Sequence, residues 1–342
     1  DEAECIGHSV LDAIHTPFEV DGTRLEIGAS AGISLYPSNA RDASTLLRYA
    51  DVAMYAAKRQ GCGLAVYDVA LDPHSPRRLA MMTELGEAIR KNHLLLHFQP
   101  RVSLIGRRLV GVEALVRWQH PQLGLVQPSQ FIPLAEMSDS IRPLTWWVLE
   151  AALAQRGWWA AQGLAPRIAV NFSARHLVDD AAPVQLERLL SRYGANPQGL
   201  ELEITESAII ADPDRALDVL TRIHAMGVHL SIDDFGTGYS SLAYLKRLPL
   251  HALKIDLSFV SHMTHSERDA IIVRSTTNLG HNLGLTVVAE GVEDSATLDN
   301  IEAQFANTQE KFYLGLAVNF LDQKAALPVL APDREQLLEY DI

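Results

Sequence analysis

Six apolar segments of this 342-residue sequence carry a polar residue at or near their end, where a buried strand would normally hold another apolar side chain. These polar residues are Glu113, Asn171, Glu203 with Glu206, the adjacent pair Asp233 and Asp234, Lys254, and Glu290. Apart from the lysine, all of them offer a carboxylate or amide oxygen, and none is a histidine or a cysteine. Oxygen donors of this kind favour Mg²⁺ or Mn²⁺ over Zn²⁺. If the six segments meet in space, the sequence predicts a site for divalent metal ions.

The adjacent aspartates Asp233 and Asp234 indicate what such a site would do. Two neighbouring carboxylates suit a pair of metal ions about 3.5–4 Å apart, which can clamp a phosphodiester and activate a water molecule. Lys254 would orient that water or neutralise developing charge, and Glu290 would accept its proton or help to hold the second ion. Taken alone, an Asp-Asp pair before a Gly-rich turn is more often a helix cap or a turn. The joint pattern over six segments favours a two-metal phosphodiesterase.

Strands and helices alternate over the part of the chain that holds these residues. The predicted strands are 94–98, 109–116, 167–171, 200–205, 228–233, 253–255 and 285–289, with an eighth within 311–320. The predicted helices are 144–162, 182–193, 215–226, 270–283 and 295–305. This alternation predicts an α/β fold that closes into a TIM-type barrel, where the C-terminal ends of the strands meet on one face. Such a barrel would bring the six polar positions together.

The N-terminal part of the chain has a different pattern. A strand is predicted at 25–36, a helix at 42–60 and a second strand at 64–67. Two prolines in a polar stretch then predict a linker at 69–79, followed by a helix at 79–91. The sequence thus predicts a small α/β segment ahead of the barrel.

The charge of the chain argues against binding to duplex nucleic acid. Lys and Arg number 29 against 42 Asp and Glu, which gives a net charge of −13, and no basic stripe offsets it. There is no run of 18 apolar residues and no secretory leader, and the two cysteines have neither metal-type nor disulfide spacing. We therefore expect a cytoplasmic chain. Because it begins at Asp1 rather than Met, we also expect upstream sequence with a sensory domain, which could anchor the full-length protein in a membrane.

Seven motifs of the chain resemble those of EAL-domain phosphodiesterases and follow in the family's order. The signature itself lies in Gly111-Val-Glu-Ala-Leu-Val-Arg117. The other motifs are Phe98-Gln-Pro100, Asn171-Phe-Ser173, Glu203-Ile-Thr-Glu206, Asp233-Asp-Phe-Gly-Thr-Gly-Tyr-Ser-Ser241, Lys254-Ile-Asp256 and Ala289-Glu-Gly-Val-Glu293. The resemblance covers about residues 80–295. It implies a modified TIM-type (β/α)8 barrel that hydrolyses cyclic di-GMP to linear pGpG with two Mg²⁺ or Mn²⁺ ions.

The resemblance also implies roles for residues of these motifs. The implied metal ligands are Glu113, Asn171, Glu203 and Asp233, with Asp234 on the second ion. The implied catalytic residues are Glu113, Lys254 and Glu290, of which the last two act on the water. The implied contacts to the ligand are Gln99, Leu115 and Arg117, the last through a phosphate, which suits its planar fork. Glu206 would anchor the Gly-rich loop after Asp234, which in this family often lies at a dimer interface, so we expect a homodimer.

The beginning of the chain resembles the C-terminal part of a GGDEF domain. Ser30-Ala-Gly-Ile-Ser-Leu-Tyr-Pro37 and Leu47-Arg-Tyr-Ala-Asp-Val-Ala-Met-Tyr-Ala-Ala-Lys58 carry this likeness. The GGDEF motif itself is not in the chain, so no diguanylate cyclase activity is expected. The predicted organisation is a GGDEF-like part at 1–68, the linker at 69–79, the barrel at 80–325 and a divergent tail at 326–342.

The sequence leaves two alternatives to the enzyme, a cyclic di-GMP receptor and an interaction scaffold. A degenerate EAL domain would bind cyclic di-GMP as a weak or inactive receptor, yet every metal-binding position that can be placed is filled here. The departure from the family pattern after Glu293, where a Gln-Gly pair and an Arg-Pro turn are absent, weakens that preference. An interaction scaffold would instead use aromatic residues as a docking surface, but such residues at helical spacing are more often core. The residues concerned are Trp146, Trp147, Trp158 and Trp159.

Overall fold

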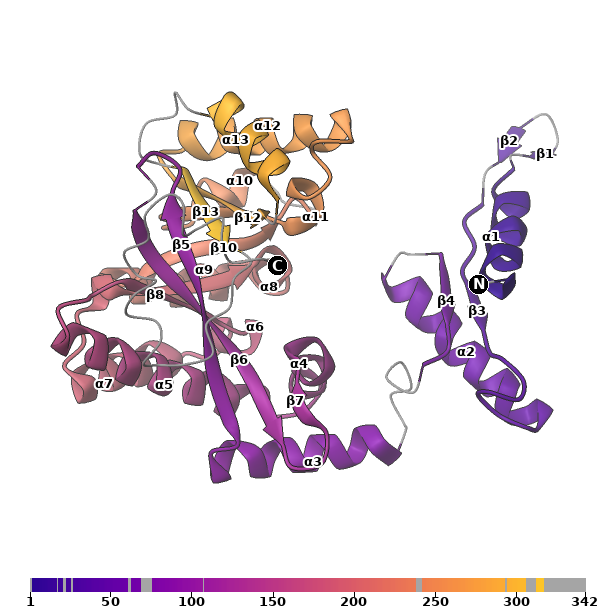
Figure 1. Cartoon of the computed structure of the whole chain (residues 1–342), viewed down its shortest axis with the longest axis horizontal. Helices are drawn as coiled ribbons and strands as arrows, with labels where there is room; N and C mark the ends of the chain where they lie inside the picture. Colours follow the sequence, from indigo (N-terminus) through magenta and orange to yellow (C-terminus); the bar gives the residue numbers. More distant parts are fainter. Residues whose placement is uncertain are drawn as a thin grey trace. The chain divides into compact units, whose positions relative to one another are not determined.

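The chain divides into two compact units, an N-terminal unit (Asp1–Leu85) and a barrel unit (Gly86–Ile342). Figure 1 shows the elements of both in a computed structural model. The described residues are 2–16, 18–20, 23–25, 27–60, 63–68, 76–106, 108–237, 242–292, 294–305 and 312–316.

The N-terminal unit consists of two helices and two small sheets. Its elements are α1 (Glu2–His15), the antiparallel pair β1 (Phe18–Val20) and β2 (Thr23–Leu25), the parallel pair β3 (Ala31–Ile33) and β4 (Leu64–Val66), and α2 (Ala43–Gln60). The predicted helix at 42–60 is confirmed as α2. The long strand predicted at 25–36 is wrong, because the backbone after Ile33 turns, with Leu35 N donating to Asn39 Oδ1 at 2.6 Å. Gly32 is required in β3, since a Cβ there would lie 2.0 Å from the carbonyl oxygen of Ala50 on α2.

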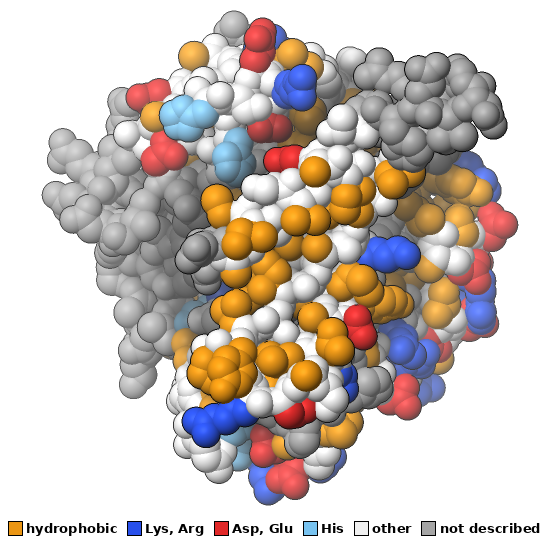
Figure 2. All heavy atoms as spheres, turned by 90° about the vertical axis from the view of Figure 1, so that its right-hand side faces the viewer, with side chains coloured by type: hydrophobic (Ala, Val, Ile, Leu, Met, Phe, Trp, Pro, Cys, Tyr) orange, Lys and Arg blue, Asp and Glu red, His pale blue; other side chains and the backbone are white. Residues whose placement is uncertain are grey.

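Several large apolar side chains of the N-terminal unit are exposed. The exposed fraction is 60% for Ile6, 70% for Tyr36, 69% for Leu47 and 62% for Tyr55. Figure 2, which views the molecule from the right-hand side of Figure 1, shows many hydrophobic side chains on the surface turned to the reader. Exposed apolar surface of this kind is typical of a face that packs against another part of a domain.

Eight strands close into a barrel in the second unit (Figure 1). In their order around the barrel they are β5 (Leu94–Ser103), β6 (Leu109–His120), β8 (Arg167–Asn171), β9 (Leu200–Thr205), β10 (His229–Phe235), β11 (Ala252–Ile255), β12 (Thr286–Val292) and β13 (Phe312–Leu316). A short strand, β7 (Gly124–Val126), pairs with β6 alone. The predicted TIM-type barrel is therefore confirmed, and β13 supplies the predicted eighth strand without the family's Gln-Gly pair.

One barrel strand runs against the predicted all-parallel pattern. β5 is antiparallel to both of its neighbours, β6 and β13, whereas the other neighbours in the closed barrel are parallel. Only 104–108 connect β5 to β6, and a parallel pair needs a crossover of about a dozen residues or more. A connection this short therefore forces a hairpin.

Helices surround the barrel, and all five predicted ones are present with ends within three residues of the prediction. The longer helices are α3 (Pro76–Lys91), α4 (Pro128–Met137), α5 (Ile141–Ala161), α7 (Ala182–Tyr193), α9 (Pro213–Ala225), α12 (Glu267–Asn282) and α13 (Ser295–Phe305). The short ones are α6 (Ala174–Leu177), η2 (Pro197–Gly199), α8 (Glu206–Ile210), α10 (Leu242–Leu245) and α11 (Leu257–Val260). Among the described residues, no helix is long and apolar enough to span a bilayer.

The described residues cover only part of the predicted linker and none of the predicted tail. The first turn of α3 takes up 76–79 of the predicted linker, because Pro76 fits the first position of a helix, where its missing N–H is not needed. The predicted tail at 326–342 lies outside the described residues. The four predicted domain ranges stay predictions. Of the tryptophans weighed as a docking surface, Trp159 is 1% exposed and packs edge-on against Phe98.

The side chains of β9 illustrate how the barrel is filled. Leu200, Leu202 and Ile204 are fully buried and alternate with Glu201 and Glu203, which are 5% and 1% exposed. Because side chains alternate across a strand, the leucines and isoleucine face the surrounding helices while both glutamates face the barrel interior. The interior therefore holds charged groups where such barrels usually hold branched apolar residues.

His176 on α6 gives the barrel a pH-dependent stability. Its ring is 1% exposed and lies against Trp146 and Phe172, with ring centroids 5.3 and 4.9 Å away. Burial, together with the positive charge of Arg142, lowers the pKa of His176 to about 4. His176 binds a proton near pH 6.5 in the unfolded chain but only near pH 4 in the folded chain. Its contribution to the free energy of unfolding is therefore complete above pH 6.5 and is lost as the pH falls toward 4.

We expect His176→Gln to flatten the fall in unfolding free energy between about pH 6.5 and 4 by up to about 1.4 kcal/mol per pH unit. Urea unfolding at several pH values measures this slope. The same change at the exposed His262 is the matched control for the substitution itself. Equal slopes in the wild type and His176→Gln would contradict the prediction.

Candidate active site

The six polar positions singled out in the sequence lie on six neighbouring strands. Along β6, β8, β9, β10, β11 and β12, which are adjacent in this order, they are Glu113, Asn171, Glu203, Asp233, Lys254 and Glu290. The register supports their proximity, since Asn171 is paired with Glu203 across β8 and β9. The barrel thus brings together residues far apart in the sequence, as predicted.

Lys254 is the centre of this group. Its side chain is fully buried, and Nζ donates to Glu113 Oε2 at 3.2 Å, Glu203 Oε2 at 3.0 Å and Asp233 Oδ2 at 3.0 Å. The three protons of the ammonium group are thus matched by three acceptors, and Glu290 Oε1 forms an ion pair with Nζ at 2.6 Å. We call Glu113, Glu203, Asp233, Asp234 and Glu290 the carboxylate cluster.

Two charged residues beneath the cluster, Arg101 and Glu201, were not predicted from the sequence; each is 5% exposed. Arg101 Nη2 donates to Glu113 Oε2 at 2.9 Å and to Glu203 Oε1, while Nη1 donates to Glu201 Oε1 at 3.0 Å. The signal was present, because Glu201 and Glu203 alternate along one strand, as do Gln99 and Arg101 along β5. Residues two apart on a strand share a face.

Asp233 and Asp234 would point to opposite faces of a regular strand. Here β10 has a register shift between Ile232 and Phe235, and Asp234 adopts a φ of 54°. Aspartate tolerates this left-handed conformation better than most residues, and bulges of this kind redirect side chains near functional sites. As a result, one carboxylate oxygen from each of Asp233, Asp234 and Glu290 lies within 4.8 Å of the others.

The cluster holds more negative charge than its two cations balance. Burial raises the pKa of Glu290 to about 7, since together with repulsion by Asp233 it outweighs the attraction of Lys254. Burial, with repulsion by Asp233 and Asp256, raises the pKa of Asp234 to about 6. Burial also opposes ionisation of Glu113, but Lys254 and Arg101 outweigh it and lower the pKa of Glu113 to about 2. Burial, with repulsion by Glu113 and Asp233, also raises the pKa of Glu203 well above its usual value despite Arg101 and Lys254. Negative charge therefore exceeds what the two cations compensate at Glu203, Asp234 and Glu290.

The donor set fits a site for divalent cations. Its oxygens come from the five cluster carboxylates and from Asn171. The Nδ2 of Asn171 donates to Glu113 Oε1 at 3.1 Å, so its amide oxygen is not used in this contact and can bind a cation. Closely spaced carboxylates disfavour one another unless a cation offsets their charge. Oxygen-only donors suit Mg²⁺ or Mn²⁺, as the sequence predicted.

Glu206 contacts the start of the Gly-rich loop. It is 3% exposed, and its Oε2 accepts a hydrogen bond from Gly236 N at 3.3 Å. Gly236 has a φ of 101°, which only glycine adopts readily. This contact fits the anchoring role expected for Glu206. The loop residues 238–241 lie outside the described residues.

A groove of about 670 Å³ opens beside the cluster between β6, β8, β9 and helices α4 and α5. Asn171 and Glu203 form its edge toward the cluster, and the predicted ligand contact Leu115 lies in its wall. Gln99 is opposite Glu113 across β5 and β6 and is not among the residues that line this groove. Arg117 does not line this groove: it is 7% exposed, and its Nη1 donates to Val116 O at 2.9 Å.

Comparisons with known proteins give the following matches. The family described as "EAL domain" matches residues 82–304, and "Diguanylate cyclase, GGDEF domain" matches residues 1–63. Among curated proteins, the bifunctional diguanylate cyclase/cyclic di-GMP phosphodiesterase MucR of Pseudomonas aeruginosa is 40% identical over 316 residues, which are 92% of this chain and 46% of MucR. The cyclic di-GMP phosphodiesterase NbdA of the same organism is 40% identical over 294 residues, 85% of this chain and 38% of NbdA. The chain spans less than half the length of these two relatives.

Two solved structures extend the comparison to the fold. The PaMucR phosphodiesterase in complex with c-di-GMP matches with a TM-score of 0.67 at 39% identity, over 72% of this chain and 99% of that one. An EAL domain protein from Listeria monocytogenes EGD-e matches with a TM-score of 0.62 at 30% identity, over 72% of this chain and 96% of that one.

Proposed function

Because the chain belongs to the EAL domain family, we propose that it is a metal-dependent phosphodiesterase that hydrolyses cyclic di-GMP to linear pGpG. The observation that carries this proposal is the carboxylate cluster gathered around Lys254 at the edge of a ligand-sized groove. The names of the relatives MucR and NbdA, and the cyclic di-GMP in the PaMucR complex, support the choice of substrate.

The metal ligands in this proposal are those expected from the motifs, Glu113, Asn171, Glu203 and Asp233, with Asp234 on a second ion. When bound, two divalent ions supply a clamp on the phosphodiester and lower the pKa of the attacking water. The position of Asp234 beside Asp233 and Glu290 supports its assignment to the second ion.

The chain's own groups would handle the protons. In the hydrolysis the oxygen of water bonds to phosphorus, one phosphorus–oxygen ester bond breaks, and the ribose oxygen leaves with a proton. Glu290, whose pKa is raised by burial, lies beside the proposed second ion and suits the acceptance of the water's proton. Lys254, fixed among four carboxylates, would hold their positions and offset negative charge that develops on the phosphate.

We place the nucleotide in the groove beside the cluster, with Leu115 and Gln99 in contact with it. Arg117 would have to turn from its contact with the carbonyl of Val116 to reach a phosphate. The loop held by Glu206 would form the contact between two copies in the homodimer, which a sizing column would detect.

Removal of metal ions tests the proposed reaction. We expect the purified chain to convert cyclic di-GMP to pGpG with Mg²⁺ or Mn²⁺ and to lose this turnover in a chelator, recovering it when metal is restored. Chromatography of the products measures turnover, and calorimetry measures binding of the substrate separately. Tight binding without hydrolysis at saturating Mn²⁺ would instead identify a receptor, and loss of both would remove the substrate assignment.

A further inference from the structure

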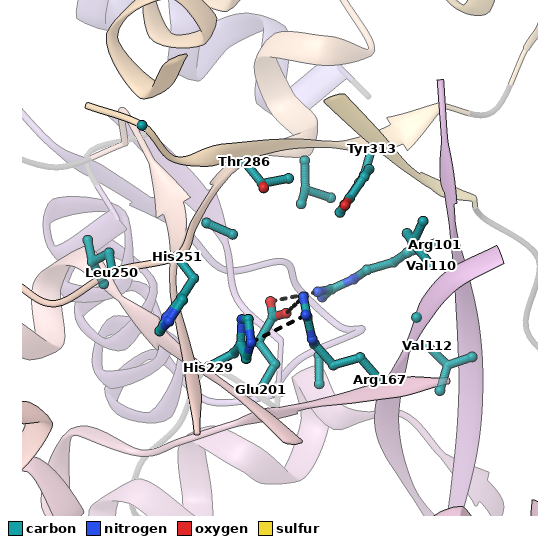
Figure 3. Close-up of a pocket in the computed structure, with 15 residues that line it drawn as sticks. Arg101, Val110, Val112, Arg167, Glu201, His229, Leu250, His251, Thr286 and Tyr313 are labelled. Carbon is teal, nitrogen blue, oxygen red and sulfur yellow. Dashed lines mark hydrogen bonds and ion pairs between the residues drawn. The ribbon is translucent and has the colours of Figure 1, made fainter. Parts of the chain in front are cut away.

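A second cavity lies at the opposite mouth of the barrel, and we call it the N-terminal cavity. Its volume is about 260 Å³, and its lining residues come mostly from the starts of the parallel strands, among them Arg167, His229 and Thr286 (Figure 3). The carboxylate cluster occupies the other ends of the same strands. Arg101 lies between the two, because Nη1 contacts Glu201 of the cavity wall while Nη2 contacts the cluster.

Hydrogen-bond donors from several strands face this cavity. Figure 3 shows Arg167 and His229 on one side of the opening, with the side chains of Thr286 and Tyr313 directed toward it from the other. Within the described part of the chain, neither of these two hydroxyl groups makes a hydrogen bond. These two hydroxyls are donors without a partner of their own. They lie opposite the guanidinium of Arg167, whose Nε donates to Gln198 O at 3.4 Å and whose Nη1 and Nη2 lie 3.8 Å from Glu201 and 3.3 Å from His229.

The cavity has little negative charge available for these donors. Glu201 is the one carboxylate among its lining residues, and its two oxygens are already 3.0 Å from Arg101 and 3.8 Å from Arg167. Arg167 Nη2 also lies 3.3 Å from His229 Nε2, and the rings of His229 and His251 are tilted by 36° with their centroids 4.1 Å apart. Arg167 thus lies beside two imidazoles, and its nearest carboxylate, Glu201, is shared with Arg101. The positive charge of Arg167 can therefore attract one more negative group.

The charge on the histidines is suppressed in the same region. Burial, followed by the charge of Arg167, lowers the pKa of His229 to about 4. Burial, with the neighbouring His224 and Arg167, also lowers the pKa of His251. The groups that face this pair from the packed elements are thus Arg167, His224 and Glu201, of which only Glu201 favours protonation. An anion in the cavity would reverse that balance.

We propose that the N-terminal cavity binds a small tetrahedral oxyanion, a phosphate group, through Arg167, Thr286 and Tyr313, with His229 beside it. The guanidinium fork and hydroxyl donors suit the several acceptor oxygens of a phosphate. The volume accommodates a phosphate with a few water molecules, since each water takes about 30 Å³. This site is distinct from the proposed reaction, and its test does not depend on hydrolysis.

Binding of inorganic phosphate to the full chain tests this site. Chelated protein is used at constant ionic strength, because without metal ions the carboxylate cluster repels anions and cannot compete for them. We expect calorimetry to show saturable binding with a Kd of about 1 mM. We also expect added phosphate to raise the pKa of the His229 ring, which NMR measures. No saturable binding up to about 20 mM phosphate would overturn the proposal.

Three variants make the test specific. Arg167→Gln removes the charged donor, and Thr286→Val removes only a hydroxyl from a strand residue of the same shape; each should weaken phosphate binding at least about tenfold. Arg192→Gln is the matched control, because Arg192 is an exposed arginine of α7 whose side chain pairs with Glu150 outside the cavity. It should bind as the wild type does. Unchanged binding in Thr286→Val and Arg167→Gln would place the anion elsewhere and refute the site.

Two further ligands test the class of anion. Methyl phosphate should bind within about tenfold of inorganic phosphate, because the cavity has space for one carbon beside the phosphate. Acetate should bind more weakly, since it offers two oxygens in a plane. Acetate that binds more tightly than phosphate would refute the tetrahedral assignment.

Discussion

Glu113→Gln is expected to lower cyclic di-GMP hydrolysis by about 10³-fold or more, the order of loss found when one electrostatic group of an active site is removed. Both oxygens of Glu113 face donors: Oε2 is 3.2 Å from Lys254 Nζ and 2.9 Å from Arg101 Nη2, and Oε1 is 3.1 Å from Asn171 Nδ2. The amide nitrogen of glutamine must therefore oppose a donor or force Asn171 to flip. Either change disturbs a second proposed metal ligand besides removing the charge of the first.

Glu201→Gln is the matched control for this prediction. Glu201 is a carboxylate of similar burial that also binds Arg101, but it faces the N-terminal cavity rather than the groove. The same chemical change there should lower turnover less than about tenfold, because no proposed metal ligand loses its charge. Initial rates at saturating Mn²⁺, with circular dichroism to verify folding, measure both variants. Equal losses would mean that the total charge of the network matters rather than the position of Glu113, and turnover of Glu113→Gln near the wild-type rate would remove Glu113 from the site.

The barrel and the carboxylate cluster could be predicted from the sequence, because both depend on local patterns. Apolar strands at regular intervals indicated the fold, and polar residues at their ends indicated Asn171, Lys254 and all five carboxylates of the cluster. These strands are buried on both faces, so a charged residue in one of them stands out against its neighbours. The side chains then meet simply because parallel strands of a barrel end on one face.

The features that were not predicted from the sequence depend on contacts between distant segments. Arg101 follows a proline in a strand that was predicted to end at Phe98. Its contacts with Glu113 and Glu203 depend on the antiparallel pairing of β5 with β6, which places it beneath these two carboxylates. The bulge that turns Asp234 toward Glu290 is likewise a feature of β10 pairing with β11. The long strand predicted at 25–36 was wrong because the side chain of Asn39 bonds the backbone and bends the chain, which periodicity does not reveal.

Lys254→Met is expected to destabilise the metal-free barrel by about 3–5 kcal/mol, the usual result of removing one partner from a buried ion pair. Lys254 is fully buried, and its Nζ contacts four carboxylates that would lose their shared cation. Methionine fills a similar volume, so the loss reports charge rather than a cavity. In a unit of this size the melting temperature should fall by roughly 10 °C in a chelator.

Metal ions should partly reverse this loss, which separates the electrostatic explanation from a packing defect. If divalent cations bind the cluster, Mn²⁺ should raise the melting temperature of Lys254→Met by more than that of the wild type, because the variant's carboxylates have less positive charge around them. Lys91→Met is the control: Lys91 Nζ is 2.7 Å from Glu87, closer than Lys254 is to three of its partners, but its side chain is 61% exposed. Solvent screens such a pair, so that change should leave the melting temperature unaltered with or without metal. A Lys254→Met variant as stable as the wild type in chelator, or one that gains no more from Mn²⁺, would show that the cluster does not depend on this lysine for its charge balance.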